Sequence, residues 1–135
     1  MIRCIAPRLL VTSLFLLLSH ATLGEGFQTP AIKAADLQTR QATADPLLVV
    51  DVRPTGEYKS GHIAGAVSIP YTKVDQHLDE FRTAKGVVLY CTQGYRTQEA
   101  ERILLDHQVP NILHLEGGLG AWQMAGYPIN TGWGP

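Results

Sequence analysis

The alternation of apolar and polar positions along the chain predicts a domain in which strands and helices alternate. Continuous apolar runs, typical of strands buried on both faces of a parallel sheet, occur at Leu47–Val50 and Val87–Tyr90. Two further strands are predicted at Ala66–Ile69 and Ile112–Leu115. Helices are predicted around these runs, at Ile32–Thr43, Pro54–Ser60, Lys73–Phe81, Thr97–His107 and Leu119–Met124. This order of elements indicates an α/β domain with a mainly parallel sheet.

The first residues of the chain have the pattern of an export signal. Arg3 and Arg8 precede Leu9–Leu18, a mostly apolar stretch of ten residues, which is shorter than the roughly twenty residues of a typical spanning helix. Small residues at the −3 and −1 positions suit cleavage after Ala21, so 1–21 is predicted to be a signal peptide, with 24 as the alternative last residue. An uncleaved anchor is the other interpretation. Cleavage would place the protein in the periplasm or outside the cell.

Composition and charge fit one globular domain and argue against two classes of partner. The chain has 135 residues, of which 45% are hydrophobic and 17% charged, as expected for an ordinary domain. Loss of the signal peptide lowers the formal net charge from −1 to −3. No basic cluster is present, so neither nucleic acid nor, after signal cleavage, a membrane is an expected partner. Residues 22–30 are predicted to be a polar leader, 31–128 the folded domain and 129–135 an irregular tail.

Cys91 is the cysteine that an exported form of the chain would keep, because Cys4 lies in the predicted signal peptide. Exported proteins usually pair their cysteines, so a lone thiol between a strand and a helix is a candidate nucleophile. The first N–H groups of a helix lack internal partners and favour an anion such as a thiolate. Gly94 would let the loop curl, and Arg96 adds a positive charge. The alternative for Cys91 is a small buried apolar residue.

The length of this loop discriminates between two thiolate chemistries. Phosphatases that use a cysteine need the spacing Cys-x5-Arg, which wraps a tetrahedral phosphate. This chain has Cys91-x4-Arg96, one residue shorter. A tighter ring of N–H donors suits a single extra sulfur on the cysteine better than a phosphate. The spacing therefore favours a persulfide over phosphatase or arsenate reductase chemistry.

Three segments of the chain resemble the rhodanese (sulfurtransferase) family. Asp51-Val52-Arg53 followed by Glu57–Pro70 resembles the family pattern D-x-R…E-x-x-x-G-H-I-x-G-A-x-x-I-P. Cys91–Arg96 resembles the active-site loop C-x-x-G-x-R, and Gly117–Trp122 resembles the closing G-G-x-x-x-W. Together they cover nearly all of the chain after the signal, as in the small, single-domain, exported members. The resemblance implies a rhodanese-like domain with about five parallel strands flanked by helices on both faces.

The resemblance also implies a mechanism with a Cys91 persulfide and without a metal or organic cofactor. Cys91 would take a sulfane sulfur from thiosulfate or a related donor and pass it to a thiophilic acceptor, cyanide in vitro. The loop would hold this sulfur through residues Thr92, Gln93, Gly94, Tyr95 and Arg96. Members that are most active on thiosulfate often have basic residues where this chain has neutral Thr92 and Gln93. The alternative is therefore a persulfide-carrying or redox-sensing module that serves a thiol-bearing protein acceptor, with little small-molecule turnover.

Other polar residues near these segments allow structural interpretations. Asp51 and Arg53 either orient the catalytic loop or form a buried charge pair that holds the rim of the sheet together. Glu57 is expected to pair locally, with Arg53. Glu99 and Glu101, in the first helical turns after the loop, either partly oppose its positive charge or point to solvent. His114 is expected to be a surface or cap residue, because its spacing to other histidines does not suit a metal site.

Overall fold

The computed structural model describes residues 28–134 of the chain. The predicted signal peptide, Cys4 and most of the predicted polar leader lie outside the described residues. Between residues 28 and 134, no helix has the length and apolarity needed to cross a bilayer.

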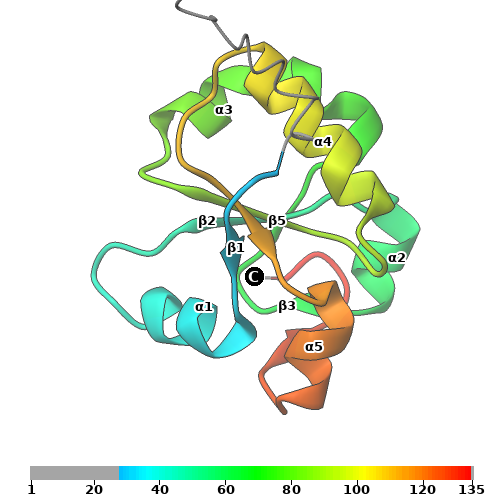
Figure 1. Ribbon diagram of the computed structural model, residues 1–135. Helices are drawn as coiled ribbons and strands as arrows, with labels where there is room; N and C mark the ends of the chain where they lie inside the picture. Colours follow the sequence, from blue (N-terminus) through cyan, green and yellow to red (C-terminus); the bar gives the residue numbers. More distant parts are fainter. Residues whose placement is uncertain (1–27, 135) are drawn as a thin grey trace, which may run out of the picture.

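The described residues form an α/β domain around a five-stranded parallel sheet, as predicted (Figure 1). The order of its strands is β1 (Ala31–Ile32), β6 (Ile112–Leu115), β5 (Val87–Tyr90), β2 (Leu48–Asp51) and β4 (Val67–Ser68). Every neighbouring pair in this sheet is parallel. All four residues of the central strand β5 are buried, which explains their continuous apolar pattern.

Helices cover both faces of the sheet and close two hydrophobic clusters (Figure 1). One cluster lies under the 3-10 helix η1 (Tyr71–Gln76) and the helices α3 (Leu78–Thr83) and α4 (Tyr95–Asp106). The other lies under α1 (Ala34–Gln41) and α5 (Gly118–Met124). Successive residues of β5 enter opposite clusters: Leu89 packs with the first and Val88 with the second. The sheet is thus held from both sides.

The first predicted helix is wrong at its start. Ala31–Ile32 forms β1 at the edge of the sheet, and helix α1 runs over Ala34–Gln41 instead of Ile32–Thr43. The N–H groups of His114 and Glu116 donate to the carbonyls of Pro30 and Ile32, at 2.9 and 3.0 Å. The open edge of β6 supplies these partners, and a two-residue strand leaves no periodic pattern in the sequence.

The predicted helix Lys73–Phe81 is two shorter elements, η1 and α3, which meet at His77. His77 has φ −119° and ψ 19°, which interrupts the helical backbone. Val74 and Phe81 are nevertheless both buried. The apolar spacing identified the inward-facing residues correctly, although it missed the break between the elements.

The carboxyl-terminal segment 129–135 is not irregular throughout, as had been expected. Ile129–Asn130 forms β7, which pairs antiparallel with β3 (His62–Ile63). The ring of His62 is buried. Its Nδ1 lies 2.9 Å from the carbonyl oxygen of Tyr58, and its Nε2 lies 3.0 Å from the carbonyl oxygen of Gly134. These contacts give His62 a structural role: it ties the tail to helix α2 (Thr55–Ser60).

Candidate active site

Cys91 directly follows β5, at the carboxyl edge of the sheet, where open parallel sheets bind ligands. Its thiol is buried, and Sγ accepts a hydrogen bond from the backbone N–H of Gly94 at 2.9 Å. Gly94 has φ +96°, so the loop curls at this residue as predicted. Helix α4 begins at Tyr95, two residues before its predicted start at Thr97. The curl aims a peptide dipole at the sulfur, and this arrangement stabilises negative charge there.

A cavity of about 400 Å³, called here the outer cavity, opens at this sulfur. Its lining residues are Glu57, Cys91, Thr92, Gln93, Tyr95 and Arg96. The structure therefore brings five of the six predicted loop residues together around one space. The sixth, Gly94, lines a smaller neighbouring cavity. Glu57, which was expected only to pair with Arg53, also lines this cavity. Its place in the E-x-x-x-G-H segment was the feature of the sequence that could have indicated this.

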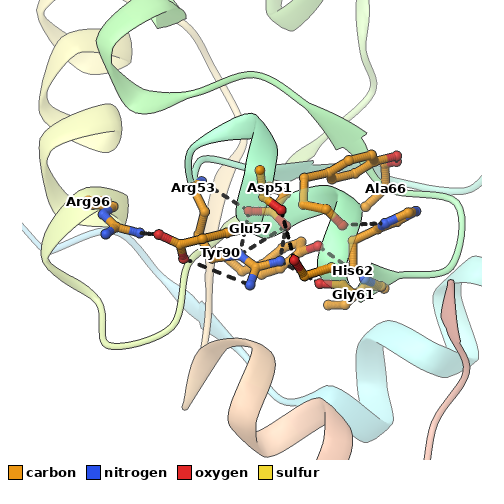
Figure 2. A network of polar contacts seen from close by, with 12 residues as sticks. Asp51, Arg53, Glu57, Gly61, His62, Ala66, Tyr90 and Arg96 are labelled. Atoms are coloured by element: carbon orange, nitrogen blue, oxygen red, sulfur yellow. Dashed lines mark hydrogen bonds and ion pairs between the residues drawn. The ribbon is translucent and has the colours of Figure 1, made fainter. Parts of the chain in front are cut away.

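Four charged side chains form a series beside the outer cavity (Figure 2). Arg53 Nη2 donates to Asp51 Oδ2 at 2.6 Å, and both side chains are almost fully buried. Arg53 Nη1 lies 4.0 Å from Glu57 Oε2, and Arg96 Nη1 donates to Glu57 Oε1 at 2.8 Å. Burial opposes the cationic form of Arg53, but its bond to Asp51 and the nearby carboxylates outweigh this and raise its pKa.

Asp51 and Arg53 support the rim of the site from below its lining. Neither residue lines the outer cavity. Arg53 also donates to the carbonyl of Gly61 at 2.7 Å, which links the end of β2 to the end of α2. Burial and the charge of Asp51 raise the pKa of Tyr90, whose hydroxyl accepts a hydrogen bond from the N–H of Ile63. This network agrees with the interpretation of Asp51 and Arg53 as a buried pair that holds the rim together.

A second, inner cavity of about 130 Å³ also touches Cys91. Its lining residues are Cys91, Thr92, Gln93, Gly94, Thr97, His114, Leu115, Gly117 and Gly118. His114 Nδ1 donates to Glu101 Oε1 at 2.7 Å, and this bond raises the pKa of His114, although burial opposes it. Glu101 is only 4% exposed. Of the two alternatives for Glu101, solvent exposure is therefore excluded, and the expectation that His114 is a surface or cap residue is wrong.

The closing G-G-x-x-x-W segment binds the Cys91 loop to the start of α5. The N–H of Leu119 donates to the carbonyl of Cys91 at 3.0 Å. A Cβ on Gly118 would lie 2.3 Å from that same carbonyl oxygen, so only glycine fits there. Trp122 is buried, and its Nε1 donates to the carbonyl of Pro128. Within residues 28–134, no three His, Cys, Asp or Glu side chains gather in a way that could hold a metal ion.

The family model for the rhodanese-like domain matches residues 33–125. The chain belongs to this family. The match spans the three segments that carry the resemblance in the sequence, together with the strands β2, β4, β5 and β6 and the helices α1 to α5.

Known relatives agree with this assignment. A sulfurtransferase of Allochromatium vinosum is 32% identical over 98 residues, 73% of this chain and 92% of that protein. An HTH-type transcriptional regulator of Mycobacterium tuberculosis is 32% identical over 108 residues, 79% of this chain, and the chain spans only 47% of the regulator. The crystal structure of thiosulfate sulfurtransferase from Pseudomonas aeruginosa matches with a TM-score of 0.70 and 25% identity, covering 78% of this chain and 20% of that one. The family and the sulfurtransferase relative support sulfur transfer as the general activity.

Proposed function

We propose that the protein is a sulfurtransferase that moves a sulfane sulfur from thiosulfate or a related donor to a thiophilic acceptor through a Cys91 persulfide. The observation that carries this proposal is the position of the Cys91 sulfur. It receives the Gly94 N–H at 2.9 Å and borders a cavity of about 400 Å³ that can admit a small donor. The likeness to sulfurtransferases supports the same chemistry.

The reaction has two steps, each balanced in charge and atoms. The Cys91 thiolate attacks the outer sulfur of thiosulfate, the S–S bond breaks, and sulfite leaves with the electron pair. The persulfide carries one negative charge on its outer sulfur, which the N–H groups of the Thr92–Arg96 loop are suited to stabilise. Cyanide then attacks the outer sulfur, and thiocyanate leaves while the thiolate is restored. Covalent catalysis thus divides one difficult transfer into two easier ones.

Mass spectrometry after incubation with thiosulfate tests this proposal. We expect a gain of one sulfur atom on the peptide that contains Cys91, and thiocyanate production when cyanide is added. Cys91→Ala should abolish both, whereas Cys4→Ser should leave both unchanged and thus exclude the other thiol. Thiocyanate production that survives in Cys91→Ala would reject the proposal.

A second candidate function is a sulfur carrier or redox-sensing module that serves a thiol-bearing protein. The uncharged side chains of Thr92 and Gln93 in the cavity lining favour this alternative. It predicts a persulfide on Cys91 with a turnover on cyanide far below the usual enzyme range of roughly 1–1000 per second. A turnover inside that range would remove the reason for it.

We also propose that the protein acts in the periplasm or outside the cell, after removal of residues 1–21. The charged start and short apolar stretch of the sequence support this. Amino-terminal sequencing of the protein from its native compartment should begin at Thr22, or at Glu25 if the second cleavage position is used. A start at residue 1 or 2 in a cytoplasmic fraction would contradict export.

A further inference from the structure

Beside the Cys91 thiolate, the two charged side chains that line the outer cavity offset each other. Arg96 is the cation of the lining, and Glu57 is its carboxylate. Their 2.8 Å hydrogen bond joins two side chains that are 35% and 38% exposed, so both remain open to the cavity. Thr92, Gln93 and Tyr95 add no charge. A donor entering the cavity therefore meets a neutralised arginine.

Glu57 lies between two arginines, Arg53 and Arg96, and only Arg53 has a second carboxylate partner (Figure 2). Its Oε2 lies 4.0 Å from Arg53 Nη1, while its Oε1 accepts the shorter bond from Arg96. Arg53 is already compensated by Asp51, through contacts from both Nε and Nη2 to the carboxylate. The charge of Glu57 therefore acts mainly on Arg96.

This neutralisation penalises a dianion more than a monoanion. Arg96 can meet an anionic donor only beside Glu57 or after leaving it, and either arrangement puts a carboxylate near the donor. Coulomb repulsion scales with the product of the charges, so it is twice as large for thiosulfate as for a donor with a single charge at the same position. The cavity discriminates by charge and not only by size.

The lining also offers an apolar surface. Tyr95 lines the outer cavity with 67% of its surface exposed. A free aromatic ring at this position can pack against an organic substituent through dispersion and ring–ring contacts. Thiosulfate has no such substituent.

We propose that Glu57 sets the donor specificity of this site, so that it favours organic thiosulfonate monoanions over the thiosulfate dianion. The inference rests on the proposed sulfurtransferase function and deepens it. In the loading step the Cys91 thiolate attacks the sulfane sulfur of the thiosulfonate. The S–S bond breaks, an organic sulfinate leaves with the electron pair, and the persulfide is the same species that thiosulfate would form.

Steady-state kinetics of wild type and Glu57→Gln with thiosulfate and benzenethiosulfonate test the inference, with cyanide as acceptor. Glutamine keeps the size of the side chain and one acceptor oxygen for Arg96 but removes its charge. We expect kcat/KM for thiosulfate to rise about tenfold and that for benzenethiosulfonate to rise at most about threefold. The gain on thiosulfate should shrink as ionic strength increases. The reciprocal variant, Arg96→Gln, should shift the ratio of the two kcat/KM values in the opposite direction.

The matched control is Glu99→Gln, which removes the same charge from a carboxylate that bonds Arg102 and does not line the outer cavity. It should leave the ratio unchanged. If the ratio of kcat/KM for thiosulfate to kcat/KM for benzenethiosulfonate is the same in Glu57→Gln and in wild type, the inference is overturned while sulfur transfer stands. If neither donor adds sulfur to Cys91 in the wild type, the proposed function itself fails, and the inference fails with it.

Discussion

His114 and Glu101 form a hydrogen-bonded pair between β6 and α4, with 2.7 Å between Nδ1 and Oε1. His114 also lines the inner cavity together with Cys91. The bond to Glu101 raises the pKa of His114 above its ordinary value. A raised pKa in the folded state adds stability that is fully present below the unfolded pKa and is lost as pH rises through the folded value.

His114→Gln should therefore destabilise the protein in acid and much less in alkali. Glutamine can still donate a hydrogen bond to Glu101, but it carries no charge. We expect a loss of roughly 1 kcal/mol in unfolding free energy near pH 5.5, shrinking toward zero near pH 9. Denaturant titrations across this pH range measure the difference. His77→Gln is the control, because His77 bonds Glu80 in a more exposed position. A pH-independent loss in His114→Gln would contradict the charged pair.

Gly94→Ala should reduce both stability and the reactivity of Cys91. No atom lies within 4 Å of a Cβ at Gly94, so the cost comes from its φ of +96° and not from a clash. We expect a loss of about 1–2 kcal/mol, together with slower alkylation of Cys91 by iodoacetamide as the Gly94 N–H shifts from the sulfur.

Gly126→Ala provides the matched comparison for that variant. Gly126 has φ +74° and also has no atom within 4 Å of a Cβ, but it lies after α5 and not in the Cys91 loop. It should lose similar stability and keep the wild-type alkylation rate. Equal alkylation rates in both variants would show that the Gly94 contact does not govern the thiol.

Asp51→Asn should be strongly destabilising, because it leaves the buried Arg53 cation without its carboxylate. Removal of one partner from a buried pair typically costs about 3–5 kcal/mol. Asp45→Asn is the control, since Asp45 pairs with Lys85 on the surface and should cost below about 1 kcal/mol. Thermal or chemical unfolding of both variants gives the comparison. Similar losses in the two variants would contradict the structural role of the Asp51–Arg53 pair.

Local pattern was enough to predict the elements that carry Cys91. The run Val87–Tyr90 is apolar throughout because β5 is central and buried on both faces. The sequence Gly94 to Arg96 lies where a strand meets a helix, so the positive φ and the curl of the loop follow from chain geometry. These features depend on residues that are close in sequence, and the sequence alone therefore contained them.

Contacts between distant segments could not be predicted in this way. The bond from Arg96 to Glu57 joins α4 to α2 across 39 positions of the chain. The apolar spacing within Thr97–His107 predicts one inner stripe of Ala100, Ile103, Leu104 and His107, which leaves Glu101 outside it. Ala100 and Leu104 are buried, but His107 is exposed. In the structure α4 packs so that Glu101 is buried as well, because His114 on β6 supplies its partner. Such pairing depends on how helices pack on the sheet, which no periodicity encodes.

Gly118→Ala should have the largest effect among the glycine variants considered. A Cβ at this position would lie 2.3 Å from the carbonyl oxygen of Cys91, and φ of +55° adds backbone strain. The clashing atom is backbone and also accepts the N–H of Leu119, so relief requires the loop or α5 to move. We expect a loss above roughly 3 kcal/mol in unfolding free energy and, in the fraction that stays folded, impaired persulfide formation.

Gly120→Ala is the control for this prediction because it adds the same methyl group two residues further along α5. No atom lies within 4 Å of a Cβ there, and the backbone is helical. Alanine in a helix is favoured over glycine by about 1 kcal/mol, so this variant should be as stable as the wild type or more so. Thermal unfolding and the mass of the Cys91 peptide after thiosulfate treatment distinguish the two. A stable, sulfur-loaded Gly118→Ala protein would show that the Cys91 loop does not need its close contact with α5.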